Sequence, residues 1–157
     1  MNTNKFKCLV VNRIKNPQLL SSIAFNNFKY LCKFPELAHA EENIYQTLTS
    51  SGNLCYLLYD NDLLIAYLIG DFRTLADNRY VYYISYFYIA EKYRNKKIGG
   101  KILSMLINKC RSEGLKFIVL TCDTLDDKNV YFYKKYGFVP DPLLGSNKRH
   151  NVYCLYL

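Results

Sequence analysis

The segment "EKYRNKKIGGKILSMLINKC", residues 91–110, carries the residue types that hold an anion at the start of a helix. Two adjacent glycines precede an amphipathic stretch, and basic residues lie on both sides of them. The first N–H groups of a helix have no partner within the helix, and the helix dipole adds partial positive charge there. Glycine lets a ligand approach the backbone without meeting a Cβ. The segment therefore predicts a binding site for a phosphate or pyrophosphate group.

Two elements must position this site. The run "RYVYYISYFYIA" (79–90) is rich in aromatic and β-branched residues and predicts a strand before it. A helix is expected from about Ile98 to a stop at Gly114. Its buried stripe, at helical period, consists of Ile98, Ile102, Leu106 and Cys110.

A second pair of elements follows. The continuous apolar run "KFIVLTC" (116–122) is typical of a strand buried on both faces. Asp126 and Asp127 can cap a short helix over 128–136, which Gly137 ends. These residues predict strand–helix–strand crossovers in the second half of the chain.

The first half of the chain predicts an antiparallel hairpin in place of crossovers. At the other end of the chain, a last strand is expected over 151–157. The 157 residues are expected to form a single domain, 1–157, with the order β-α-α-β-β-β-α-β-α-β. Turn residues "DND" between two apolar runs predict a hairpin. The other expected elements are a strand over 6–11, helices over 17–31 and 35–50, and strands over 53–60 and 63–72.

The net charge of +8 makes an anionic ligand, a nucleic acid or a membrane surface candidate partners. No run of five or more like charges occurs, which argues against a nucleic-acid tail. The N-terminus has no signal-peptide apolar region, and no apolar run reaches about 18 residues. A soluble, cytoplasmic protein without membrane contact is expected.

The six cysteines form no Cys-x-x-Cys pair, and we expect them to be reduced and buried. With His39 and His150 as the only histidines, the sequence argues against a zinc site. No metal ligand is therefore assigned.

The order of strand, "YRNKKIGG", helix, buried strand and "NVYFYKKYGF" resembles the GNAT superfamily, the acetyl-CoA-dependent N-acetyltransferases. The family's pyrophosphate loop, Arg/Gln-x-x-Gly-x-Gly/Ala, falls on residues 94–99, with Lys97 in place of the first glycine. Its second signature, Asn-x-x-Ala-x-x-Leu/Phe-Tyr-x-Lys-x-Gly-Phe, falls on 126–138, with Asp126 and Asn129 as departures. "NVYFYKKYGF" also resembles the C-terminal segment of glucosamine-6-phosphate N-acetyltransferases.

The resemblance implies an α/β fold: a mixed, mostly antiparallel sheet of six to seven strands, about four helices, and a splayed parallel strand pair. It implies acetyl-CoA as cosubstrate, with the pantetheine arm between "YFYIA" and "FIVLTC". The residues that would bind acetyl-CoA are Tyr88, Ile89, Arg94, Asn95, Lys96, Lys97, Ile98, Gly99, Gly100, Lys101, Asp126 and Asn129.

By the same resemblance, Tyr133 is the general acid that protonates the departing thiolate. A phenol with a pKa of about 10 and a thiol with a pKa of about 8.5 are roughly matched for that transfer. The backbone N–H of Ile89 would polarise the thioester carbonyl. Phe132 and Phe138 are interpreted as core residues.

The general base has no clear candidate. Many family members carry a Glu at the position of Ser85. Neither Ser85 nor Tyr86, which follows it, is a good general base at neutral pH. A water chain beside Tyr86, Tyr88, Asp71 or Asp123 is the alternative.

Two functions stay open on the sequence. One is an N-acetyltransferase in which a small amine, an amino sugar or a protein amine attacks acetyl-CoA directly in a ternary complex. The other is a catalytically weak or inactive domain that binds acetyl-CoA as a sensor or interaction module. In folds of the resembled family, the acceptor is set by the early helices and by loops such as 73–78 and 141–150, which carry no motif here. The chain is expected to be a monomer or a homodimer.

Overall fold

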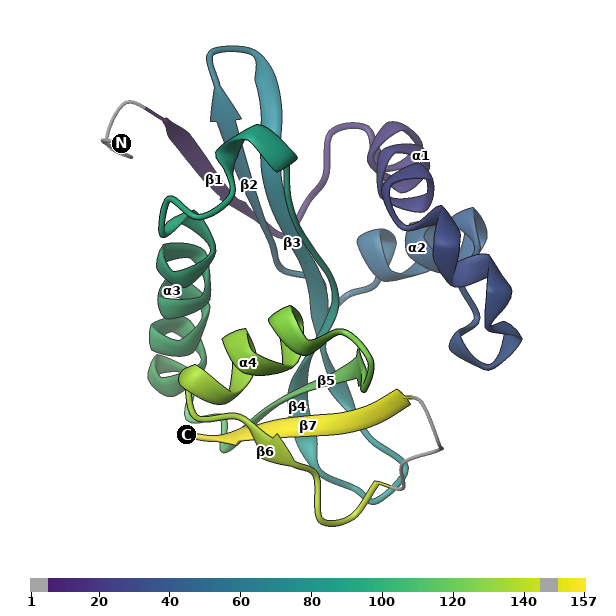
Figure 1. Cartoon of the computed structure of the whole chain (residues 1–157), viewed down its shortest axis with the longest axis vertical. Helices are drawn as coiled ribbons and strands as arrows, with labels where there is room; N and C mark the ends of the chain where they lie inside the picture. The colour runs from purple at the N-terminus through teal and green to yellow at the C-terminus, as the bar shows by residue number, and fades with distance from the viewer. Residues whose placement is uncertain (1–5, 145–149) are drawn as a thin grey trace. The chain divides into compact units, whose positions relative to one another are not determined.

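Seven strands form one sheet, in the order β1-β2-β3-β4-β5-β7-β6, in the computed structural model, which describes residues 6–144 and 150–157 (Figure 1). The strands are β1 (Lys7–Val11), β2 (Cys55–Asp60), β3 (Leu63–Thr74), β4 (Tyr80–Ile89), β5 (Phe117–Asp123), β6 (Val139–Pro140) and β7 (His150–Tyr156). The helices are α1 (Pro17–Asn27), α2 (Glu41–Thr49), α3 (Ile98–Ser112) and α4 (Asp127–Lys135). Short 3-10 turns cover Lys29–Lys33, Pro35–Leu37 and Glu91–Tyr93.

The sheet is mixed. β1 pairs antiparallel with β2, β2 with β3, β5 with β7, and β6 with β7. β4 and β5 are parallel, with Tyr82–Ile84 beside Ile118–Leu120. The predicted fold class is thereby confirmed in strand number, helix number and the parallel pair. The splay of that pair stays a prediction.

The chain divides into two compact units, which we describe separately. The first comprises Met1–Asp71 and Tyr86–Gly99. The second comprises Phe72–Ser85 and Gly100–Leu157. The expectation of a single domain over 1–157 stays a prediction.

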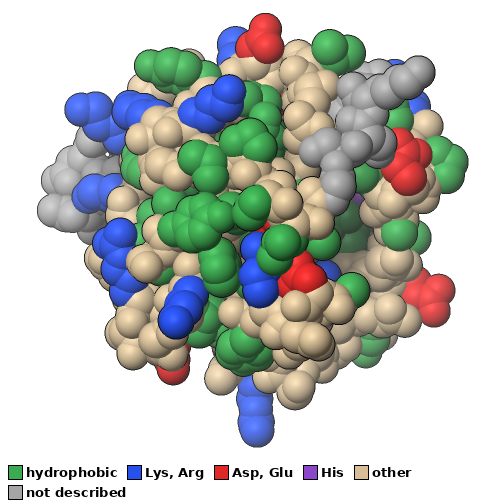
Figure 2. Space-filling view, turned by 90° about the horizontal axis from the view of Figure 1, so that it is seen from below, with side chains coloured by type: hydrophobic (Ala, Val, Ile, Leu, Met, Phe, Trp, Pro, Cys, Tyr) green, Lys and Arg blue, Asp and Glu red, His purple; other side chains and the backbone are tan. Residues whose placement is uncertain are grey.

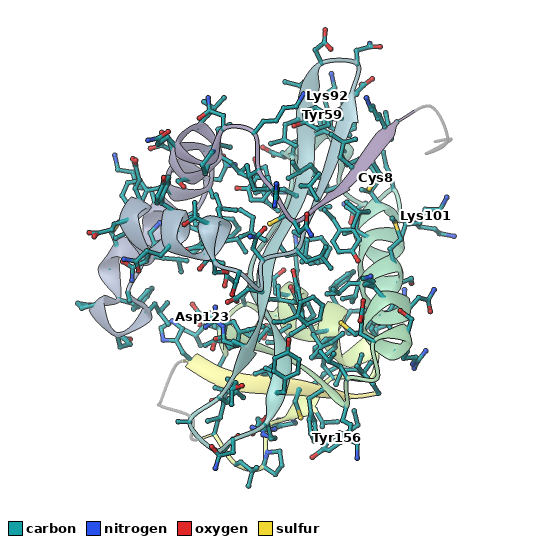
Figure 3. All side chains as sticks on the ribbon, turned by 180° about the vertical axis from the view of Figure 1, so that it is seen from behind. Cys8, Tyr59, Lys92, Lys101, Asp123 and Tyr156 are labelled. Carbon is teal, nitrogen blue, oxygen red and sulfur yellow. The ribbon has the colours of Figure 1, made fainter. Side chains whose placement is uncertain are left out.

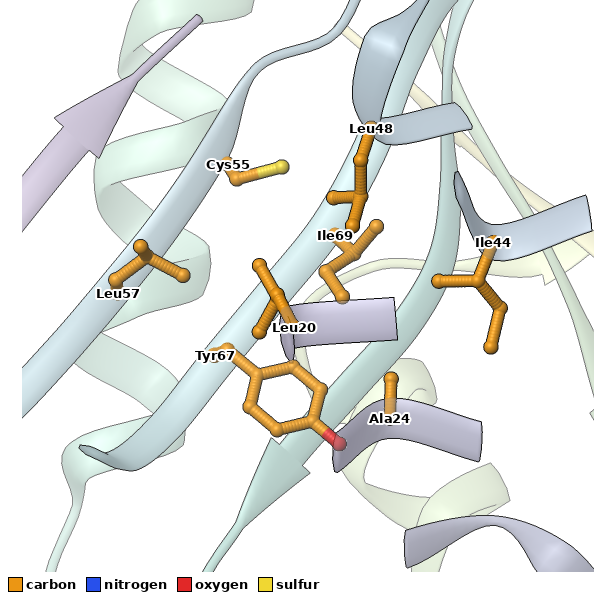
Figure 4. Packing of buried hydrophobic residues seen from close by; sticks show 8 residues of the cluster. All are labelled: Leu20, Ala24, Ile44, Leu48, Cys55, Leu57, Tyr67 and Ile69. Carbon is orange, nitrogen blue, oxygen red and sulfur yellow. The ribbon is translucent and has the colours of Figure 1, made fainter. Parts of the chain in front are cut away.

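The core of the first unit lies between α1, α2 and the β2–β3 hairpin (Figure 4). Pro17 occupies the first turn of α1, and the side chain of Asn16 caps it by accepting the Leu19 N–H at 3.1 Å. The buried side chains are Leu20, Ala24, Ile44, Leu48, Cys55, Leu57, Tyr67 and Ile69.

The expected second helix over 35–50 is shorter than its sequence indicates. Pro35–Leu37 forms a single 3-10 turn, and Ala38 then adopts a left-handed conformation with φ 50°. α2 begins only at Glu41. The first helix also ends early, at Asn27, before a 3-10 turn. In both places, tertiary contacts override helix propensity.

In the second unit, β5 is buried on both faces as predicted, because Ile118, Val119 and Leu120 are each at most 2% exposed. Gly114 and Gly137 adopt positive φ after α3 and α4, as expected for helix stops. The predicted helix boundaries in this half are therefore close to those observed.

All six cysteines are free thiols. Cys55, Cys110, Cys122 and Cys154 are buried, as expected. Cys32 is exposed, which corrects the prediction for that residue, because it lies on a 3-10 turn and not in a helix packed on the core.

A buried ion pair connects the β3–β4 turn to the segment after β6. The guanidinium of Arg79 donates to Asp141 at 2.9 and 3.0 Å and to Asp77 at 2.8 to 3.1 Å. The Asp141 side chain is fully buried and also accepts the N–H groups of Leu143 and Leu144. Burial raises the pKa of Asp141, but the hydrogen bonds from Arg79 and these amides outweigh it and hold the pKa below its ordinary value.

Replacing Asp141 by Asn should lower the free energy of unfolding by about 3 kcal/mol at neutral pH, because Arg79 keeps a partly unpaired buried charge. A lowered pKa in the folded state stabilises the fold above the unfolded-state pKa, and this stabilisation is lost as the pH falls through the folded pKa. Urea unfolding at several pH values should show a flatter acid dependence in Asp141→Asn than in the wild type. The exposed pair Lys109–Glu113 supplies the control, since Glu113→Gln should cost less than about 0.5 kcal/mol. An unchanged acid slope in Asp141→Asn would contradict the assignment.

Candidate functional site

The turn between β4 and α3 is anchored by Tyr93. This side chain is 5% exposed, and its hydroxyl donates to a carboxylate oxygen of Asp60 at 2.6 Å. Its ring meets the ring of Phe6 edge to face, with centroids 5.8 Å apart. The turn is therefore fixed to the strand region of the first unit before α3 begins.

Arg94 folds back onto the end of β4. Its Nε–H donates to the carbonyl of Ile89 at 2.8 Å, and its guanidinium carbon lies 5.7 Å from the centroid of the Tyr88 ring. Tyr88 in turn stacks on Tyr67, with centroids 5.3 Å apart. The Nη groups of Arg94 are the part of the side chain that can reach an anion, while Nε stabilises the turn.

Two residues of the turn have left-handed backbone. Asn95 has φ 60° and Lys97 has φ 65°. Asparagine tolerates this region, but lysine does so at a cost of roughly 1–3 kcal/mol. Lys97 thus takes the conformation that a glycine would adopt at this position of the loop.

At the start of α3, exposed lysine side chains surround a buried isoleucine. Lys96 and Lys97 are exposed, and Lys101 projects outward from α3 (Figure 3). Ile98 is 2% exposed, so its side chain belongs to the core. Gly99 is half-buried.

Gly100 is required by packing. A Cβ at Gly100 would overlap the hydroxyl of Tyr136 and lie 3.1 Å from Cζ of that ring. Close contact between α3 and the end of α4 therefore explains this glycine without a ligand. Its expected role in cofactor binding stays a prediction.

Asp126 and Asn129 cap α4 together. Asp126 Oδ1 accepts the N–H of Asn129 at 3.2 Å, and the Asn129 side-chain amide donates to Oδ2 at 2.8 Å. Their departure from the family pattern thus has a local structural role. Contact with a cofactor arm stays a prediction.

Tyr133 lies on α4 among aromatic rings. The centroids of Phe132 and Phe138 are 5.3 and 5.4 Å from its own, both edge to face. Burial raises the pKa of Tyr133, and the charges of Cys122 and Asp126 act in the same direction. The phenol is therefore protonated at neutral pH, and it is a weaker acid than the near-match to a thiol that the sequence suggested.

The candidates for the general base differ in burial and in their hydrogen bonds. Ser85 is half-buried on β4. Asp71 is 8% exposed and bridges to Asn53 through the backbone. Asp123 uses a carboxylate oxygen to accept the N–H of Leu125 at 2.9 Å. None of these positions identifies a base.

Tyr86 has a partner that sequence reasoning missed. Its hydroxyl lies 2.7 Å from Nδ1 of His39, and the two residues are 47 positions apart. The sequence considered His39 only as a metal ligand, and no local pattern near either residue could have indicated the pair. Burial raises the pKa of Tyr86 to about 12.

Within residues 6–144 and 150–157, no group of three or more His, Cys, Asp or Glu side chains could hold a metal ion. No helix in the same described ranges is both long and apolar enough to cross a membrane. On the face shown in Figure 2, most Lys and Arg side chains lie toward the left and upper left, and apolar side chains occupy the middle.

Residues 22–138 match the family model described as "Acetyltransferase (GNAT) family". A comparison with curated protein sequences found no significant match. These findings give no specific support for the expected local similarity to glucosamine-6-phosphate N-acetyltransferases.

Three solved structures illustrate the shared fold. Naa50 from Arabidopsis thaliana, in complex with a bisubstrate analogue, is 20% identical, with a TM-score of 0.74 over 98% of this chain and 99% of that chain. PaiA N-acetyltransferase from Thermoplasma acidophilum, in complex with coenzyme A, is 14% identical, with a TM-score of 0.69 over 96% and 99%. A GNAT family acetyltransferase from Elizabethkingia anophelis with acetyl-CoA bound is 21% identical, with a TM-score of 0.65 over 98% and 99%.

The left-handed backbone at Lys97 can be tested by glycine substitution. Lys97→Gly should raise the free energy of unfolding by about 1 kcal/mol, because glycine adopts this conformation without a Cβ penalty. Lys96→Gly is the matched control: Lys96 has no positive φ, so glycine there should destabilise by roughly 0.5–1 kcal/mol. Urea unfolding of both variants measures the difference. Equal destabilisation by the two glycines would show that the turn is not strained at Lys97.

Proposed function

The chain belongs to the acetyltransferase (GNAT) family, and we propose that it transfers the acetyl group of acetyl-CoA to a primary amine by direct attack in a ternary complex. As a member of this family it is an acyltransferase, with acetyl-CoA as its cosubstrate. The acceptor class and the roles of individual residues are our proposal.

The observation that carries the proposal is the turn into α3. Left-handed residues at 95 and 97 bring the chain directly into the helix at Ile98, with exposed lysines around its first turn. Helix N-terminal amides and nearby cations together favour a pyrophosphate group. We assign the amides from Lys97 to Gly100 to the pyrophosphate of acetyl-CoA, assisted by the Nη groups of Arg94.

The reacting groups follow from the same assignment. The N–H of Ile89 would polarise the thioester carbonyl, which lowers the barrier to attack by the amine. Tyr133 would supply the proton to the departing thiolate. The hydroxyl carries its proton throughout the neutral range, and burial makes it a weaker acid than a free phenol.

A peptide amine is the first acceptor to test. Naa50, which shares the fold, was crystallised with the analogue CoA-Ac-MVNAL. A panel should also contain small amines and an amino sugar, since the sequence leaves these classes open. The aromatic side chains near Tyr86, among them Phe28 and Tyr88, suit an acceptor with an apolar body.

The alternative, an acetyl-CoA sensor without turnover, is favoured by the absence of a carboxylate at Ser85. The sensor hypothesis and the enzyme hypothesis predict the same acetyl-CoA site and differ only in whether an amine is acetylated. Acetylation of any amine at a rate above the uncatalysed reaction excludes it.

Thermal unfolding with acetyl-CoA tests the cofactor site. A ligand at about 100 times its Kd stabilises the fold by roughly 2.7 kcal/mol, which shifts Tm by several degrees at this chain length. Gly99→Glu should abolish the shift, because a carboxylate at the helix start repels the pyrophosphate. Gly99→Ala, which adds bulk without charge, should retain part of it. Each variant is compared with its own Tm without ligand, and a full shift in Gly99→Glu would remove this loop from the cofactor site.

Substitution of Tyr133 by Phe tests the general acid. The variant should bind acetyl-CoA with an unchanged thermal shift and turn over on the order of 10²-fold more slowly. Tyr131→Phe is the control, because Tyr131 lies on the same helix and is 72% exposed. Wild-type kcat in Tyr133→Phe at every pH would show that another group protonates the thiolate.

A further inference from the structure

His39 is held between two partners in the first unit. Its Nδ1 lies 2.7 Å from the hydroxyl of Tyr86, and its Nε2 lies 3.1 Å from the carbonyl oxygen of Phe25. Its ring stacks on the ring of Phe25, with centroids 4.9 Å apart and planes 7° from parallel. Both ring nitrogens and one ring face of His39 are therefore engaged.

These contacts fix the tautomer of the neutral imidazole. A carbonyl oxygen can only accept, so Nε2 carries the proton that is donated to Phe25. Nδ1 is then an acceptor, and the hydroxyl of Tyr86 donates to it. The lone pairs of the Tyr86 oxygen remain able to accept an N–H group, and both side chains are half-buried, which leaves them partly accessible to a ligand.

The backbone before His39 is shaped to present this ring. Ala38 has φ 50° and ψ 41°, a left-handed conformation that a residue other than glycine adopts at a cost of roughly 1–3 kcal/mol. Ala40 is extended and begins α2 without a side-chain cap. The helix that the sequence indicates over 35–50 is thus interrupted at the residue whose side chain binds Tyr86.

Tyr86 lies on the strand that carries the proposed reaction centre. It follows Ser85, whose side chain points to the opposite face of the strand, and it precedes Ile89 by three residues on β4. A serine hydroxyl is a poor proton acceptor at neutral pH, whereas a neutral imidazole is a good one. Tyr86, on β4, is hydrogen-bonded to the imidazole of His39.

We propose that Tyr86 and His39 form the proton relay that deprotonates the acceptor amine, an inference that rests on the proposed acetyl transfer. As the amine nitrogen forms a bond to the thioester carbon, its proton passes to the Tyr86 oxygen, and the Tyr86 proton passes to Nδ1 of His39. The C–S bond breaks, and the thiolate takes the proton of Tyr133. The imidazolium then loses its proton to water, and water restores the proton of Tyr133.

The two residues have distinct parts in this relay. Tyr86 contacts the amine and is the catalytic residue, whereas His39 acts through it and positions its hydroxyl. Burial raises the pKa of Tyr86 to about 12, with the nearby Cys32 acting in the same direction. The phenol thus transfers a proton without ionising in the resting enzyme, and the imidazole is the base.

The test compares kcat across pH for the wild type, His39→Gln and Tyr86→Phe, with one acceptor, so that the titration of the acceptor is common to all. Both variants should lose on the order of 10²-fold in kcat with an unchanged KM for acetyl-CoA. His39→Gln should also lose the rising limb of the kcat–pH profile. In His39→Gly, imidazole in solution should restore part of kcat.

The groups that titrate around His39 are the Tyr86 phenol on β4, the Cys32 thiol on the turn Lys29–Lys33, and Glu36 on the turn before His39. Tyr67→Phe is the matched control. It removes a phenol of the same aromatic group, bonded to Asn27 at 2.9 Å, and should leave kcat and its pH dependence unchanged.

The outcomes separate the relay from the proposed function. If the wild type acetylates no amine in the panel, the proposed function fails and the relay fails with it. If the wild type is active and His39→Gln keeps its pH profile, the relay alone is overturned. A loss of kcat that imidazole does not restore and that preserves the rising limb also contradicts the relay, because it assigns His39 a purely structural role.

Discussion

The proposed chemistry depends on the turn from β4 into α3, which must leave the first amides of the helix without protein partners and still hold them in place. Left-handed backbone at Asn95 and Lys97 aims the chain into the helix within a few residues. The hydrogen bonds from Tyr93 to Asp60 and from Arg94 to Ile89 keep the turn fixed. A preformed site of this kind loses little conformational entropy when an anion binds, which favours affinity.

In the proposed reaction, protons are transferred through neutral phenols. Burial raises the pKa of both Tyr133 and Tyr86, so neither ionises near neutral pH. A buried phenol is a poor base and a reluctant acid on its own, and it needs a partner that takes or stabilises charge. For Tyr133 that partner would be the developing thiolate, and for Tyr86 it is the imidazole of His39. The thiol of Cys122 does not compete with Tyr133 as a proton donor, because burial raises the pKa of this thiol to about 12.

The positive charge of the chain suits a multiply charged cosubstrate. Lys96, Lys97 and Lys101 are exposed around the start of α3, where they can attract the phosphates of CoA before contact is made. Such attraction is screened by salt over about 8–10 Å at physiological ionic strength. The backbone amides contribute a shorter-range and less screened component, so cofactor binding should weaken with salt without being abolished.

The sequence by itself determined the elements whose signals are local. The glycines, the aspartate cap before α4 and the apolar run of β5 each act within a few residues, and the helix and strand boundaries from 79 to 138 were predictable for that reason. Only the tertiary structure decided the rest. Arg79 pairs with Asp141 across 62 positions, and Tyr86 with His39 across 47. Ala38 leaves the helix that its propensity favours because His39, beside it, is bonded to Tyr86 and Phe25. Contacts between residues so distant in the chain leave no periodic or local trace, because they arise only when folding brings the segments together.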